Sequence, residues 1–157
     1  MAILVTGGAG YIGSHTAAAL LERGEEVVVL DNLQTGHRRA AEGCLFYEGD
    51  IRDGEALDRI FGAHEIDAVI HFAANSLVAE SMADPGRYYH NNVCGTLCLL
   101  ERMRAHGVKR IVFSSTAAVY GEPERVPIRE TDRTEPTNAY GETKLAMERM
   151  IRWFGVA

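Results

Sequence analysis

The first thirteen residues carry the feature that most constrains the fold of this chain. The apolar run 2–5 is short and rich in β-branched side chains, which is typical of a buried parallel strand. Glycines follow at positions 7, 10 and 13, and the residues after them favour a helix that begins on the last glycine. Glycine lets the backbone turn tightly and lets an anion approach it, and a helix N-terminus offers N–H groups to that anion. The stretch therefore predicts a phosphate-binding turn between a strand and a helix.

A second apolar run, residues 26–30, ends in Asp31. Glycines alone would equally suit a tight turn that binds no ligand, so this aspartate decides between the two interpretations. It lies at about the spacing expected of the acidic residue that binds the ribose hydroxyls of adenosine. A carboxylate there also repels a 2′-phosphate, so the pattern favours NAD over NADP as cofactor.

Length, composition and charge narrow the class of protein. A chain of 157 residues, 46% of them hydrophobic, predicts one domain over residues 1–157 with a sizeable core. The net charge of −6 argues against nucleic acid as a partner. We expect no membrane partner, because no apolar segment approaches the length of a membrane span. The first strand starts at residue 2, which leaves no room for a targeting peptide, so we expect a cytoplasmic protein.

Strand and helix patterns alternate along the whole chain. This alternation, after such an opening, predicts an α/β fold, a doubly wound parallel sheet (Rossmann-like) with strand order 3-2-1-4-5. After residue 31 the expected strands are 44–48, 67–72 and 109–115, the expected helices are 53–62, 85–106 and 138–154, and residues 121–137 form a loop.

Several single residues allow two interpretations. Asp50 either caps the following helix or meets the adenine amine, with Ile51 against the ring. Cys94 and Cys98, one helical turn apart, suit a metal site less well than packing in a buried helix, so we expect no metal. His71 fits a satisfied strand-end histidine better than a catalytic one. Asn92, in the middle of a helix, is expected to bond a neighbouring backbone segment.

The chemistry-bearing residues lie near the end of the sequence. Tyr140 and Lys144 are four residues apart and therefore on one face of a helix. A cation near a phenol favours phenolate and lowers the pKa of the phenol, which suits Tyr140 to act as a base. The run Ser114-Ser115-Thr116 follows the fifth strand, where ligands of such sheets bind, so the Thr116 hydroxyl is expected to bond the same substrate oxygen.

These motifs, taken in order, resemble the extended short-chain dehydrogenases/reductases. The stretches that carry the resemblance are VTGGAGYIGSHT, DNL, GDIRD, HFAA, NNVCGTLCLLE, VFSSTAAVYG, P-x-x-E-T-D and NAYGETKLAME, which together cover nearly the whole chain. The resemblance implies an NAD enzyme acting on a small-molecule substrate, a nucleotide sugar in the epimerases of this family. It also implies a homodimer, formed by the helices 85–106 and 138–154 as a four-helix bundle.

The resemblance also assigns roles to residues. Tyr140, Lys144 and Thr116 would form the catalytic set, and Thr116 stands where the family often has serine. Lys144 would also reach the nicotinamide ribose. The cofactor set at the pyrophosphate would comprise Gly7, Gly10, Tyr11, Ile12 and Gly13. At the adenosine ribose it would comprise Asp31 and Asn32, and at the adenine Asp50 and Ile51. At the inner cofactor it would comprise Phe72, Ala73, Ala74 and Asn92, and the set also includes Ser114, Tyr140 and Lys144.

The chain departs from the family in length. Members are about twice as long, and their second half supplies further strands and most nucleotide-sugar contacts. We therefore expect a truncated fold that lacks the C-terminal substrate domain. Three functions stay open: a truncated epimerase-like enzyme acting on small alcohols, aldehydes or sugars, a non-catalytic NAD-binding module, and a half of an epimerase that needs a second chain.

Overall fold

The computed structural model describes all residues 1–157, and they form two compact units. Unit 1 comprises residues 1–74 and 98–114, and unit 2 comprises residues 75–97 and 115–157. None of the helices is both long and apolar enough to span a membrane.

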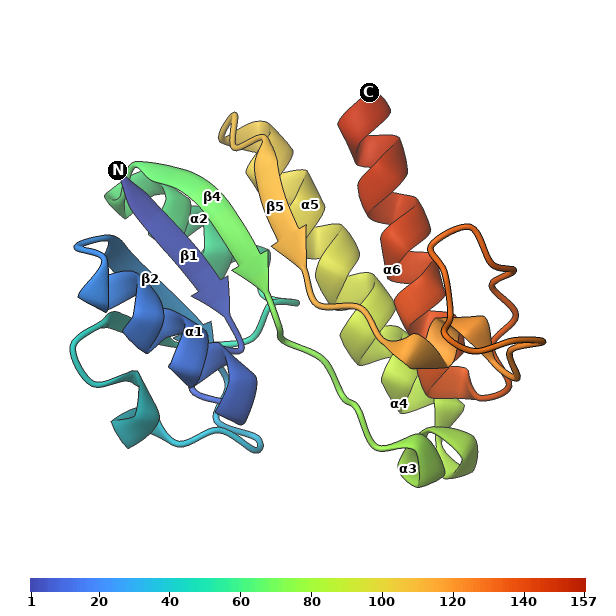
Figure 1. Cartoon of the computed structure of the whole chain (residues 1–157). Helices are drawn as coiled ribbons and strands as arrows, with labels where there is room; N and C mark the ends of the chain where they lie inside the picture. The colour runs from blue at the N-terminus through green and yellow to red at the C-terminus, as the bar shows by residue number, and fades with distance from the viewer. The chain divides into compact units, whose positions relative to one another are not determined.

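Unit 1 is built on a five-stranded parallel sheet in the order β3-β2-β1-β4-β5, as the sequence predicts (Figure 1). The central strands are near-continuous apolar runs because both faces of the sheet are covered. Helix α1 lies on one face and α2 on the other (Figure 1). The strands are β1 (Ala2–Thr6), β2 (Glu26–Asp31), β3 (Leu45–Glu48), β4 (Ile66–His71) and β5 (Arg110–Phe113), and the helices are α1 (Tyr11–Glu22), the 3-10 turn η1 (Arg38–Ala41) and α2 (Gly54–Ala63).

The starts of the two helices of unit 1 differ from expectation. Helix α1 begins at Tyr11 with Gly10 as its N-cap, so Gly13 lies inside the first turn and not at its start. Helix α2 is capped by Asp53, whose carboxylate accepts the amides of Glu55 and Ala56 at 3.0 and 3.1 Å. Asp50 therefore does not cap this helix, because Asp53 stands immediately before its first residue.

Unit 2 is helical. It contains α3 (Val78–Ala83), α4 (Pro85–Tyr88), the π-helical segment η2 (Tyr89–Cys94), the 3-10 turn η3 (Ala117–Tyr120) and α6 (Ala139–Val156). Helix α5 (Gly95–Ala105) begins in unit 2 and continues into unit 1. The long helix over 85–106 is thus present but interrupted by a π segment, and α3 was not predicted from the sequence.

The π segment changes which side chains are buried. A π turn contains an extra residue, so the periodicity of an uninterrupted α-helix does not continue through it. Tyr88 is fully buried, whereas the neighbouring Tyr89 is 42% exposed. Cys94 is exposed and Cys98 half-buried, so the expectation that both pack in a buried helix is wrong for Cys94.

Candidate active site

The glycine turn of unit 1 is fixed by close backbone contacts. Gly7 has φ +74° and packs against the segment after β4, since a Cβ on it would lie 2.7 Å from the amide nitrogen of Ala73. A Cβ on Gly13 would lie 2.2 Å from the carbonyl oxygen of Gly7. Both positions therefore exclude any side chain, and the turn presents bare backbone.

The first turn of α1 suits an anion. Gly10 caps it without a side-chain hydrogen bond, and the turn contains no acidic residue. Tyr11 and Ile12 are 82% and 60% exposed. The amides at this helix start, together with the positive end of the helix dipole, fit the pyrophosphate of a dinucleotide.

Asp31 connects the end of β2 to the glycine turn. Its carboxylate accepts the amide of Ala9 at 2.9 Å and the amide of Leu33 at 2.8 Å, one at each oxygen. Leu33 has a positive φ of 57°. Sequence reasoning missed this structural role, in which the Asp31 carboxylate fixes the backbone at Ala9 and Leu33. The role is separate from any contact that Asp31 makes with a ribose. The carboxylate retains further acceptor capacity, so the two roles are compatible.

Asp50 lies in a polar cluster with Asn32 and Arg52. The Arg52 guanidinium donates to both carboxylate oxygens at 2.8 and 2.7 Å, its amide donates at 2.9 Å, and the side-chain amide of Asn32 donates at 3.0 Å. The hydrogen bonds from Arg52 hold the pKa of Asp50 far below its ordinary value. The structure thus brings together Asn32, which the resemblance assigns to the ribose, and Asp50, which it assigns to the adenine, and the adjacent Ile51 is buried.

The end of β4 lies against the glycine turn. The amides of Phe72 and Ala73 both donate to the carbonyl of Thr6, at 2.9 and 3.1 Å. His71 is fully buried and shares a 2.6 Å hydrogen bond with the Thr6 hydroxyl, so the expected structural role is confirmed. The Ser114 amide donates to the His71 carbonyl at 3.1 Å and extends the pairing of β4 with β5.

Unit 2 contains the predicted catalytic residues. Tyr140 lies in the first turn of α6, and Lys144 follows one turn later with only 3% of its side chain exposed. Burial lowers the pKa of Lys144 to about 8, while the charge of Glu148 opposes part of that fall. Ser115 donates a hydrogen bond to Glu148. The Lys144 amine is thus mostly protonated at pH 7 in a poorly solvated place.

Thr116 begins the turn η3. Its hydroxyl accepts the amide of Ala118 at 3.2 Å and caps this turn, which leaves its O–H as a donor. A Cβ on Gly141 would lie 2.7 Å from the Ala118 carbonyl, so glycine lets the start of α6 pack directly on η3. This contact brings the backbones that carry Thr116 and Tyr140 together. Gly141 was not among the predicted site residues.

Asn92 fills the structural role that its place in a helix suggests. Its side-chain oxygen accepts the Asn75 amide at 2.8 Å, and its nitrogen donates to the Asn75 carbonyl and to the Thr143 hydroxyl, each at 3.0 Å. It is fully buried. Asn92 therefore connects the segment after β4 to helix α6, and the bond to a neighbouring backbone segment is confirmed.

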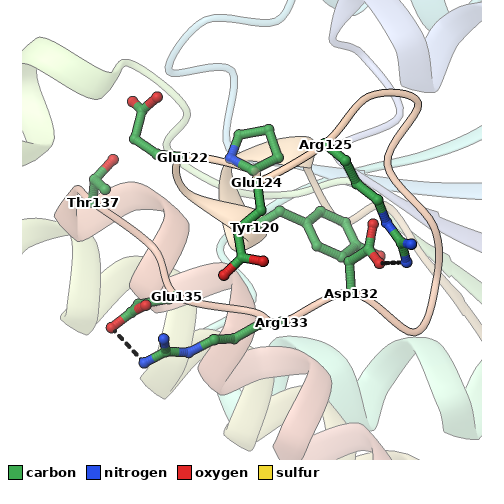
Figure 2. A pocket seen from close by; sticks show the side chains of 9 residues that line it. Tyr120, Glu122, Glu124, Arg125, Asp132, Arg133, Glu135 and Thr137 are labelled. Carbon is green, nitrogen blue, oxygen red and sulfur yellow. Dashed lines mark hydrogen bonds and ion pairs between the residues drawn. The ribbon is translucent and has the colours of Figure 1, made fainter.

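A pocket of about 440 Å³ lies elsewhere in unit 2, in the loop between η3 and α6 (Figure 2). Its walls carry two ion pairs, Arg125 with Asp132 at 2.5 Å and Arg133 with Glu135 at 2.9 Å. None of the residues predicted for cofactor binding or catalysis lines it.

Comparison with known proteins identifies the family. Residues 3–157 match the family described as the NAD dependent epimerase/dehydratase family. The chain is 66% identical over 153 residues to UDP-glucose 4-epimerase of Halalkalibacterium halodurans, covering 98% of this chain and 46% of that protein. The chain thus spans about half the length of the curated relatives it matches.

Solved structures of UDP-glucose 4-epimerases are also similar to this chain over about half of their length. The crystal structure of UDP-glucose 4-epimerase from Brucella ovis in complex with NAD is 48% identical with a TM-score of 0.97, covering 99% of this chain and 48% of that one. The enzyme from Thermotoga maritima with UDP-glucose is 43% identical with a TM-score of 0.95, covering 99% and 52%. The similarity of the motifs to UDP-glucose 4-epimerase and the Rossmann-like fold are confirmed, and the family description names the expected cofactor, NAD. The chain belongs to the NAD dependent epimerase/dehydratase family.

Proposed function

We propose that this chain binds NAD and uses Tyr140 to move a proton during oxidation of a hydroxyl group on a small-molecule substrate. A nucleotide sugar is the substrate class suggested by the relatives, one of which was solved with UDP-glucose. The observation that carries the proposal is the buried Lys144, held one helical turn from Tyr140 on α6.

Unit 1 fits the adenosine and pyrophosphate parts of NAD. The pyrophosphate is suited by the bare backbone at Gly7, Gly10 and Gly13 and by the start of α1, where no side chain caps the helix amides. The side-chain oxygens of Asp31 and Asn32 would bind the ribose hydroxyls. The adjacent Asp50 and Ile51 would bind the adenine. The family resemblance assigns binding of the inner part of the cofactor to Phe72, Ala73, Ala74, Asn92, Ser114, Tyr140 and Lys144.

Unit 2 supplies the acid/base group. Tyr140 accepts the proton of the substrate hydroxyl, and Lys144 lies one helical turn away on α6. The O–H of Thr116 donates to the same substrate oxygen. When bound, NAD supplies the hydride-transfer chemistry, while the protein supplies placement and charge.

The first test is binding. Titration calorimetry of the native chain with NAD and with NADP should show tighter binding of NAD. The Asp31→Ala variant should lose this preference, because the carboxylate that repels a 2′-phosphate is removed. Preference of the native chain for NADP would contradict the assignment of Asp31.

The second test is turnover. NAD reduction is followed at 340 nm with UDP-galactose, free galactose or a small alcohol as substrate. Tyr140→Phe keeps the ring but removes the proton acceptor, so its rate should fall about 100-fold or more. NAD binding with no turnover in either protein would favour the non-catalytic module.

A second candidate function follows from the length comparison. Since the chain spans about half of its relatives, it is also a candidate for one half of a UDP-sugar epimerase that acts with a further segment. Addition of the remaining half of a relative as a separate polypeptide tests this. Interconversion of UDP-glucose and UDP-galactose by the mixture alone would support it, and an inactive mixture would count against it.

A further inference from the structure

Both backbone polar groups of Tyr140 are held by buried hydroxyl groups. The amide of Tyr140 donates to the Ser81 hydroxyl at 3.0 Å, and its carbonyl accepts from the Thr143 hydroxyl at 2.8 Å. Ser81 and Thr143 are both fully buried. Nothing in the sequence near Tyr140 points to Ser81, which lies 59 residues earlier on α3.

The first turn of a helix has amides without partners inside the helix. In α6 the side chain of Asn138 accepts the amide of Gly141 at 2.8 Å, which is an ordinary N-cap within the chain segment. Ser81 accepts the adjacent amide, that of Tyr140, from a different helix. It therefore fixes the start of α6 against α3 in a way that Asn138 cannot.

Ser81 is itself held in one orientation. Its hydroxyl donates to the Val78 carbonyl at 2.7 Å, so its oxygen is left to accept from Tyr140. The start of α3 is fixed by the buried Tyr88, whose hydroxyl accepts the Leu77 amide at 2.9 Å and lies 2.8 Å from Glu80 Oε2. Arg87 donates to the other oxygen of Glu80 at 2.7 Å.

We propose that Ser81 is a positioning residue for Tyr140. By accepting the Tyr140 amide, its hydroxyl fixes the first turn of α6 and with it the direction of the phenol. The inference deepens the proposed function and rests on it for its kinetic part. A misplacement of a reacting group by about 1 Å costs on the order of 100-fold in rate, so the loss of this bond is expected to be visible in turnover.

The test compares three variants of the full chain. Ser81→Ala removes the hydroxyl, and Ser81→Thr keeps an oxygen at the same place. Thr96→Val is the matched control, because Thr96 is also fully buried and its hydroxyl donates to the backbone carbonyl of Asn92 at 2.6 Å, whereas the amide and carbonyl of Tyr140 are bonded by Ser81 and Thr143. All three are compared with the native chain for folding, NAD affinity, and kcat and KM of NAD reduction.

We expect Ser81→Ala to lower kcat about 10-fold or more, with KM and NAD affinity within about twofold of native, because phenol placement matters most in the transition state. Ser81→Thr should recover most of that rate. Thr96→Val should lose stability but keep its kcat. A folded Ser81→Ala protein with native kcat, or an equal loss of kcat in Thr96→Val, would overturn the proposal.

A second measurement needs no turnover and separates this inference from the proposed function. Hydrogen exchange of the Tyr140 amide should be at least about 10-fold faster in Ser81→Ala than in Thr96→Val. If Tyr140→Phe retains native turnover, the proposed function fails while this exchange still reports on Ser81. Equal protection of the Tyr140 amide in both variants would overturn the positioning role itself.

Discussion

Replacement of Lys144 by methionine should stabilise the protein at neutral pH. Only 3% of Lys144 is exposed in the native fold, and burial lowers the pKa of its amine from the ordinary 10.5 to about 8. One pH unit of pKa corresponds to about 1.4 kcal/mol, so protonated Lys144 costs the fold about 3 kcal/mol at pH 7. Methionine is similar in length and carries no charge to desolvate, so Lys144→Met removes that cost.

The sign of the pH dependence follows from proton linkage. A lysine whose pKa is lower in the folded state binds fewer protons there, so folding becomes more favourable as the pH rises from about 8 to 10.5. Above that range the amine is neutral in both states. The advantage of Lys144→Met should therefore shrink from about 3 kcal/mol at pH 7 to about 1 kcal/mol at pH 10.

Chemical denaturation at pH 7 and pH 10 measures both values. The only other lysine of the chain, Lys109, is exposed, which makes Lys109→Met the matched control. That variant should change the free energy of unfolding by less than about 0.5 kcal/mol at either pH. The reasoning is refuted if Lys144→Met is less stable than native at pH 7, or if its advantage is the same at pH 10.

Three further predictions concern the glycine turn, the helix surface and the substrate. Gly13→Ala should abolish NAD binding in calorimetry, because its Cβ would overlap the Gly7 carbonyl oxygen at 2.2 Å. The control is Gly62→Ala in α2, where an added Cβ would have no neighbouring atom within 4 Å, and this variant should raise the free energy of unfolding by about 0.5–1 kcal/mol. We expect a homodimer in sedimentation at micromolar concentration, and Trp153→Glu should weaken it, because Trp153 is a large apolar side chain that is 69% exposed on α6. A monomeric native chain would contradict this. With residues 1–157 alone, interconversion of UDP-galactose and UDP-glucose should be very slow, because relatives are about twice as long and distant binding contacts position a sugar for reaction; turnover at an ordinary enzyme rate would count against this expectation.

The sheet and its order were predictable because they depend on local patterns. Short, mainly apolar runs, each followed by a turn signal, mark the strands whether or not their partners are known. The glycine spacing marks the turn after β1 because Gly7 and Gly13 have no room for a side chain. Helix starts were less well predicted: Gly10, and not Gly13, proved to be the cap of α1. A glycine that serves a tight contact and one that starts a helix look alike in sequence.

The sequence by itself determined the fold class, the strand order and the residue types of the candidate site. Tertiary structure alone decided what surrounds those residues. It placed Ser81 on the amide of Tyr140, connected Asn92 to Thr143, directed the Asp31 carboxylate to two backbone amides, and buried the Lys144 amine enough to lower its pKa. Periodicity and spacing report which neighbours a residue has along its own helix or strand. Hydrogen bonds between residues up to 65 positions apart, and the desolvation of an amine, depend on how the elements pack, which no local pattern encodes.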